Sequence, residues 1–306
     1  MDVTICLDVN LKFTARRLRI MSNSYNDKLN ILIEKIQQAD AILVGAGSGM
    51  SAAAGLRFYY ERDDVFLKNF GKFEEKYGFH NAFDGFYYNY KSSEERWAFN
   101  AVMTCLALDF STGQPYFDLK NILKDKNYFI LTTNQDTQFT HLFPEEKISA
   151  IQGDDRYFQC SERCHDELYD AVEPCHRMKD AINDNLEIPT ELIPHCPKCG
   201  AEMEHWVRSY VFLEGKKYRE EYAKVNKFIE ENMHKKILFL ELGVGRMTPM
   251  FIQEPFWNLT HNLKNAFYIN INPNHALLPV EIEHKGLAMH EDIAKVFADA
   301  KDKINL

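Results

Sequence analysis

The chain has 306 residues, 45% of them hydrophobic, and its 36 Lys and Arg against 45 Asp and Glu give a formal net charge of −9. This composition is typical of a globular protein long enough for one large domain with an insertion or for two modest domains. It excludes a small disulfide-stapled scaffold, and the acidic balance argues against binding along nucleic acid, which needs clustered Lys and Arg.

Targeting signals and cysteine usage indicate the compartment. No apolar run reaches the roughly 18 residues of a membrane span, and the segment 1–20 lacks the uninterrupted apolar core of a signal peptide. We therefore predict a cytoplasmic protein with no membrane partner. Five of the seven cysteines fall between Cys160 and Cys199, and in a reducing compartment such clustering favours a metal over disulfides.

Hydrophobic spacing predicts helices and short buried strands in alternation. In chain order we expect a helix over 25–39, a strand over 41–44, a helix over 95–110, a strand over 128–133, a helix over 222–232, and strands over 237–242 and 267–271. The mixed charges from Lys216 to Glu221 are expected to form a solvated helix face.

This alternation predicts an α/β fold, a doubly wound parallel Rossmann-like sheet with a smaller zinc-ribbon and helical insertion domain. The stretch 59–94 is aromatic and charged without a sustained period, so it is expected to be a helical insertion or a flexible lid. The stretch 156–209 is rich in Cys, His and Pro and is expected to be the zinc-ribbon insertion. The Rossmann-like domain then takes residues 25–58, 95–155 and 210–306.

A glycine-rich turn follows the first predicted strand, Gly45-Ala46-Gly47-Ser48-Gly49-Met50-Ser51. Glycines between a strand and a helix let the backbone approach a pyrophosphate, so the turn predicts a dinucleotide site. Met50 stands in the third glycine position, and no acidic residue closes a second strand about twenty residues later. A tight turn that binds no ligand therefore stays open as an alternative.

Polar residues follow the second predicted strand in Thr132-Thr133-Asn134-Gln135-Asp136. Open α/β sheets bind their ligands at such strand ends. The Asn134 amide offers donors and acceptors to a ribose, and the Asp136 carboxylate offers an acceptor to an amide. The alternative is a turn whose Asn and Asp cap a helix.

Two cysteine pairs, Cys160 with Cys164 and Cys196 with Cys199, have the spacing of a structural zinc ribbon. Four thiolates would close a tetrahedron around the ion, so the site would be structural. The three-residue gap of the first pair is looser than usual, and substitute ligands are Cys175, His165, His176 and His195. Reduced cysteines without a metal are the other interpretation.

Taken in order, these three features resemble the sirtuin family. Gly243-Val244-Gly245 looks like its Gly-Thr-Ser turn, Ile271-Asn272-Pro273 looks like its element near the adenosine ribose, and the resemblance covers roughly residues 25 to 300. It implies NAD as a co-substrate: nicotinamide leaves C1′ of the ribose, and the ADP-ribosyl group passes to an acceptor. Asn134 would face the ribose and Asp136 the carboxamide. The cofactor-binding residues implied by motif match are Gly45, Ala46, Gly47, Ser51, Arg57, Phe58, Gly243, Val244, Gly245 and Asn272.

The chain departs from the family at three places. The first turn carries two extra residues before Ser51, and the usual Pro-Asp between the cofactor loop's Leu56 and Phe58 is missing, which puts the position of Arg57 in doubt. Gln152-Gly153 stands where the family places His-Gly, whose histidine is the general base of deacylation. Gln152 cannot take that proton, but its amide can bind ribose hydroxyls. We expect weak deacylation and retained ADP-ribosyl transfer.

The Gln-for-His change resembles the macrodomain-linked sirtuins of microbes, which act as protein ADP-ribosyltransferases. That resemblance implies a lipoylated carrier protein of the glycine-cleavage type as acceptor, and a macrodomain protein as a second partner. Arg208 follows the ribbon and is predicted to stabilise phosphate charge or orient the acceptor, with a surface arginine as the alternative. Three other functions stay open: a lysine deacylase with another base such as His165, an NAD glycohydrolase, and an NAD- or ADP-ribose-binding module without turnover.

Overall fold

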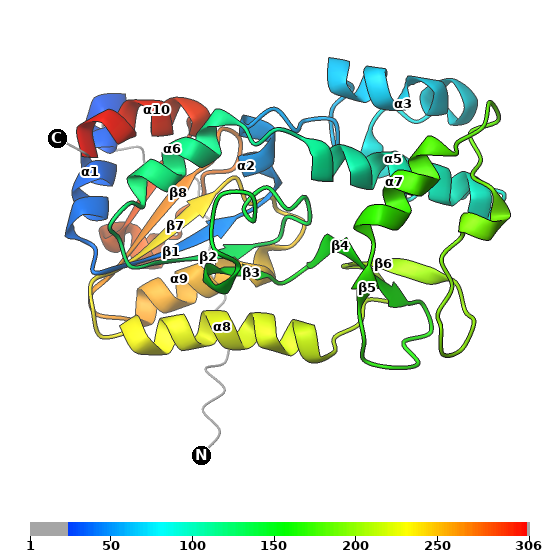
Figure 1. Cartoon of the computed structure of the whole chain (residues 1–306). Coiled ribbons are helices and arrows are strands. Elements are labelled where there is room, and N and C mark those ends of the chain that lie inside the picture. Colours follow the sequence, from blue (N-terminus) through cyan, green and yellow to red (C-terminus); the bar gives the residue numbers. More distant parts are fainter. Residues whose placement is uncertain (1–23, 305–306) are drawn as a thin grey trace.

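The computed structural model describes residues 24–304, so the predictions made for the segment 1–20 lie outside the described residues. Its main body is a parallel sheet whose strand order is β3-β2-β1-β7-β8-β9 (Figure 1). This is the order of a doubly wound Rossmann sheet, which confirms the predicted fold class. The strands are β1 (Ala41–Ala46), β2 (Tyr128–Thr132), β3 (Ile148–Ala150), β7 (Ile237–Leu242), β8 (Ala266–Ile271) and β9 (Gly286–Met289).

Helices cover both faces of this sheet (Figure 1). One face packs against α1 (Tyr25–Gln38), α2 (Ser48–Ala53), α6 (Gln114–Ile122) and α10 (Ile293–Ile304). The other face packs against α8 (Lys216–Asn232) and α9 (Gln253–Asn262). The central strands β1 and β7 are buried along their whole length, so they read as nearly continuous apolar runs and not as alternations.

A second module lies beside the sheet and contains its own antiparallel sheet, in the order β5-β4-β6 (Figure 1). Its strands are β4 (Gly153–Cys160), β5 (Tyr169–Asp170) and β6 (Met203–Val207), and its helices are α3 (Asp64–Tyr77), α4 (Ala82–Phe86), α5 (Ser93–Asp109) and α7 (Val172–Asp180). The two stretches predicted as insertions share one core here. Trp97 and Phe99 place α5 in that core as well, because its buried aromatic side chains pack against rings of α3 and β4.

The predicted helices and strands that carry long apolar patterns are confirmed within a few residues. The sequence did not predict β3 or β9, which have three and four residues, because strands this short show little periodicity. Helices α6, α9 and α10 were not predicted either. Four short 3₁₀ segments complete the element order: η1 (Glu145–Lys147), η2 (Thr190–Leu192), η3 (Pro249–Phe251) and η4 (Val280–Lys285).

Helix α8 begins at Lys216, six residues before the predicted start, and one of its charges corrects the sequence interpretation. Glu221, expected on a solvated face, is only 3% exposed. Its carboxylate accepts hydrogen bonds from the backbone N–H of Ala150 at 3.2 Å and forms ion pairs with Lys217 and Lys224. The buried charge is tolerated because it is paired and hydrogen-bonded, and it ties α8 to the edge strand β3.

Within residues 24–304, no helix is both long and apolar enough to cross a bilayer.

Candidate active site

Two glycine turns meet at the carboxyl end of the parallel sheet. Gly49 donates its backbone N–H to the Gly243 carbonyl at 2.9 Å, and a Cβ at Gly49 would lie 2.6 Å from the Gly243 Cα. A Cβ at Gly47 would likewise lie 2.8 Å from the Val244 Cα. The glycines are therefore needed for close packing of one turn on the other, with Gly243 in the left-handed region at φ +59°.

A polar cluster joins the first turn to the end of β2. Asn134 donates from Nδ2 to the Ser51 hydroxyl at 2.9 Å and to the Gly47 carbonyl at 3.0 Å. The Ser51 hydroxyl donates to Oδ2 of Asp136 and lies 3.0 Å from the hydroxyl of Tyr116. The predicted residues Ser51, Asn134 and Asp136 thus form one hydrogen-bonded group.

Three aspartates, Asp136, Asp154 and Asp155, bring their carboxyl groups together in this region. Burial raises the pKa of Asp136 above its ordinary value, and the hydrogen bonds from Ser51 and the Gln138 backbone partly offset the rise. Burial, reinforced by the carboxylates of Asp154 and Asp136, raises the pKa of Asp155 well above its ordinary value. Asp154 itself is held by Arg156, whose Nη2 donates to Oδ2 at 2.7 Å.

Gln152 lies between the two modules, directly before β4, and is 8% exposed. Its carbonyl accepts hydrogen bonds from the Arg208 backbone N–H at 2.8 Å and from Gln135 Nε2 at 3.2 Å. Its own side-chain Nε2 is buried without a hydrogen-bond partner among residues 24–304. A buried amide donor without a partner is costly unless a ligand or water completes it.

Arg208 follows β6 and is enclosed by aromatic rings. Its guanidinium lies 4.2 Å from the ring centre of Phe212 and 5.3 Å from that of Phe251, and Nη1 donates to Glu214 Oε1 at 2.6 Å. In the described part of the chain, Nε and Nη2 are buried without partners. Nε and Nη2 lie along one edge of the planar guanidinium. Two donors on one edge suit a carboxylate or a phosphate, each of which binds arginine through two oxygens.

The other predicted contacts occupy varied environments. Arg57 is exposed and donates from Nε to the Ala52 carbonyl at 3.2 Å. Phe58 is 5% exposed and stacks on Phe70, with ring centres 5.8 Å apart, inside the second module's core. Asn272 donates from Nδ2 to the Val244 carbonyl at 3.1 Å and so supports the second glycine turn. The next residue of that turn, Gly245, has open space where a Cβ would be.

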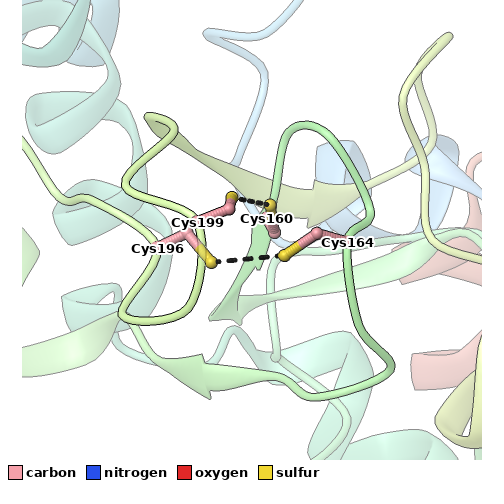
Figure 2. Close-up of side chains that lie close together, drawn as sticks. All are labelled: Cys160, Cys164, Cys196 and Cys199. Atoms are coloured by element: carbon pink, nitrogen blue, oxygen red, sulfur yellow. Dashed lines mark hydrogen bonds between the residues drawn. The ribbon is translucent and has the colours of Figure 1, made fainter.

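The four predicted cysteines converge at the end of β4. Figure 2 shows the thiols of Cys160, Cys164, Cys196 and Cys199 turned toward one another from the end of β4, the loop after it and the loop before β6, and all four sulfurs lie within 4.8 Å of one another. The Cys160–Cys199 and Cys164–Cys196 sulfur distances are 3.5 and 3.7 Å. A tetrahedral zinc with Zn–S bonds of about 2.3 Å needs sulfurs about 3.8 Å apart, so this donor set fits zinc.

Three of the four substitute ligands contact groups outside the cysteine cluster. Cys175 is buried in the core of the second module, His176 contacts Asp109 at 2.9 Å, and His195 contacts the Ile193 carbonyl at 2.8 Å. The fourth substitute, His165, contacts Cys164 Sγ through Nδ1 at 3.0 Å and the Tyr169 hydroxyl through Nε2 at 2.7 Å. Both nitrogens of His165 therefore have partners at the cysteine cluster, and neither contacts Gln152.

A crevice borders the site along the loop that follows β2. It has an empty volume of about 250 Å³, open solvent included, and is lined by Asn134, Gln135, Asp136 and Asp154 together with neighbouring apolar and Thr side chains. Sequence reasoning missed Tyr116, Asp154 and Asp155. The adjacent Asp154-Asp155 directly after Gln152-Gly153 was a usable signal, whereas nothing local marks Tyr116.

Sequence comparison finds two relatives named as ADP-ribosyltransferases. No protein-family model matches the chain. The chain is 34% identical over 293 residues to a protein ADP-ribosyltransferase of Staphylococcus aureus, covering 92% of this chain and 90% of that relative. It is 29% identical over 284 residues to a probable bifunctional ADP-ribose hydrolase/ADP-ribosyltransferase of Fusarium oxysporum, covering 88% of this chain but 46% of that relative. The chain thus spans about half the length of the fungal protein.

Solved structures support the same fold. A Sir2 homologue in complex with NAD has a TM-score of 0.56 and 12% identity, covering 90% of this chain and 93% of its own. A sirtuin structure concerned with substrate affinity has a TM-score of 0.59 and 15% identity, covering 89% and 98%. At this identity the likeness establishes the arrangement of the elements.

Proposed function

We propose that this chain, which belongs to the sirtuin family and is an NAD-dependent protein ADP-ribosyltransferase, modifies a lipoylated carrier protein of the glycine-cleavage type. The observation that supports ADP-ribosyl transfer without efficient deacylation is the buried amide of Gln152, which lies directly before β4 and between the two modules. An amide does not accept a proton near neutral pH, so the base that deacylation requires is lacking at this position.

The proposed NAD contacts lie along the two glycine turns and the end of β2. Asn134 binds the ribose, Asp136 accepts from the carboxamide, and Ser51 supports both through its hydroxyl. The Gln152 amide donates to a ribose hydroxyl, which gives its unpartnered Nε2 a partner. The bond between C1′ and nicotinamide breaks with its electron pair on nicotinamide, and the acceptor's nucleophile forms the new bond at C1′ and loses its proton to solvent water.

Arg208 contributes positive charge to the same reaction. Its unpartnered Nε and Nη2 bind an anionic group of NAD or of the acceptor, while Glu214 and the surrounding rings fix the guanidinium plane. Preorganised donors of this kind act strongly in a site from which water is excluded.

Structural zinc is proposed at the four cysteines, where it would join the loop after β4 to the loop before β6. With four thiolate ligands the ion has no open position, so it supplies stability and no chemistry at the transfer step. Because these thiols must stay reduced to bind zinc, we place the protein in the cytoplasm.

A macrodomain protein that removes ADP-ribose is proposed as a second partner. The support is the fungal relative, whose name combines an ADP-ribose hydrolase with an ADP-ribosyltransferase. This chain matches 46% of that relative's length.

The test mixes the full chain with NAD and a carrier protein, either lipoylated or bare, and identifies the products by mass spectrometry. We expect an ADP-ribose adduct on the lipoylated carrier alone, lost in Gln152→Ala and Asn134→Ala. An acyl-ADP-ribose product without an adduct would make the chain a deacylase, free ADP-ribose alone would make it a glycohydrolase, and NAD binding without nicotinamide release would leave only a binding module.

A further inference from the structure

The hydroxyl of Tyr116 is completely buried beneath the polar cluster of the site. Tyr116 lies in the first turn of α6, is 0% exposed, and packs its ring against Phe139 with ring centres 4.9 Å apart. Its hydroxyl lies 3.0 Å from the Ser51 hydroxyl. No step of the proposed transfer uses Tyr116, and the bond to Ser51 is what satisfies its buried hydroxyl.

Counting protons fixes the direction of every bond around Ser51. A serine hydroxyl has one proton and two lone pairs. The Asn134 amide nitrogen can only donate, so it occupies one lone pair, and the Asp136 carboxylate can only accept, so it takes the proton. The second lone pair remains for Tyr116, whose hydroxyl therefore donates to Ser51.

The same count fixes the Asn134 amide. Nδ2 donates to the Gly47 carbonyl as well as to Ser51, and a carbonyl accepts only, so the nitrogen and oxygen of this amide are assigned without ambiguity. Oδ1 is then turned away from both partners and is the atom left to accept from a ligand hydroxyl. Without the Tyr116 donor, the Ser51 hydroxyl gains a free lone pair and can rotate away from Asp136.

We propose that Tyr116 is a positioning residue for NAD: through Ser51 it sets the orientation of the Asn134 amide and the Asp136 carboxylate before NAD binds. The inference rests on the NAD contacts proposed above and is independent of the identity of the acceptor. A preorganised pair of polar groups spares the site the cost of ordering them when the ligand arrives.

The experiment is calorimetric titration of the full chain with NAD, in the absence of any acceptor. Tyr116→Phe removes one oxygen and keeps the ring and its packing, so we expect an unchanged fold and a roughly tenfold higher Kd for NAD, the size of one hydrogen bond between neutral groups. Tyr128→Phe is the matched control, because it removes a tyrosine hydroxyl at the opposite end of β2 and should leave the Kd unchanged.

A double-variant cycle separates positioning from general destabilisation. If Tyr116 acts through Ser51, Tyr116→Phe should add little to the loss caused by Ser51→Ala. A wild-type Kd in Tyr116→Phe, or losses in the double variant that equal the product of the two single losses, would overturn the proposal. A wild-type chain that binds no NAD would overturn the proposed contacts with it, whereas failure to modify a lipoylated carrier would leave this result unaffected.

Discussion

The parallel sheet and the second module solve the problem of burial in different ways. One face of the sheet is enclosed chiefly by aliphatic side chains such as Leu32, and the other adds rings such as Phe239 and Phe256 to its aliphatic groups. The second module packs aromatic rings, among them Phe70, Trp97 and Phe99, beside a three-stranded sheet, and four of its thiols lie close together. We therefore expect a link through the cysteines to stabilise the module, whereas the sheet is held by burial on both of its faces.

The site draws on both regions, and this explains its mixed character. Ser51 lies in α2, directly after β1, and Asn134 lies in the turn after β2, so both are held at the carboxyl end of the parallel sheet. Gln152 and Arg208 come from the two crossings between the regions and are joined by a backbone hydrogen bond of 2.8 Å. Any change that loosens the module should therefore move Gln152 and Arg208 and leave Ser51 and Asn134 in place.

The largest expected effect is loss of zinc. Cys196→Ser removes one of four ligands, and structural zinc contributes about 10 kcal/mol or more in small zinc domains, so we expect the module to unfold and transfer activity to fall below detection. Metal content by mass spectrometry and calorimetric unfolding measure this. Cys175→Ala, outside the cluster, should keep the metal. A metal-free wild-type chain with undiminished activity would contradict the distinction between the two regions.

The next effect concerns a buried carboxyl in the sheet. Glu241 is fully buried, and burial raises its pKa to about 7 from an ordinary 4.5, although Tyr268 and Gln253 donate to it. Because the folded pKa is the higher one, its contribution to stability is present below pH 4.5 and is lost as the pH rises through 7. The shift corresponds to at most about 3 kcal/mol.

Chemical unfolding of the wild type at pH 5 and pH 8 should show this loss, and Glu241→Gln should flatten it. Glu254→Gln, at an exposed position of α9, is the control and should retain the wild-type slope. Equal pH slopes in wild type and Glu241→Gln would show that the sheet holds this carboxyl without a desolvation cost.

The smallest of the three effects sharpens the role of the glycine turns. A Cβ at Gly49 meets the backbone of Gly243, which cannot move aside, so Gly49→Ala should lower the free energy of unfolding by about 2 kcal/mol. Gly71, inside α3, has nothing within 4 Å of the corresponding position, and Gly71→Ala should stabilise by about 0.5 to 1 kcal/mol. Thermal unfolding of both variants checks the contrast, and an undestabilised Gly49→Ala would mean that the turns separate freely.

Part of the site was predictable because its signals are local. The spacing of the cysteine pairs predicted the cysteine cluster. The position of Asn134 and Asp136 after an apolar strand marked them as site residues. The glycine turn was predictable as a turn, but the need for glycine there was not. Gly47 and Gly49 pack against Val244 and Gly243, about two hundred residues away in the chain. Contacts between distant turns leave no trace in the sequence around either of them.

The sequence by itself determined the doubly wound sheet, the cysteine quartet and the presence of Gln152 where the family places its histidine, since these follow from period, spacing and residue type. Only the tertiary structure decided that Phe58 lies in an aromatic core, that Glu221 is buried and paired, and that Tyr116 reaches Ser51. The physical reason is that burial and hydrogen bonding depend on the groups that pack against a residue. For these three residues, groups from segments that are distant in the sequence take part in that packing.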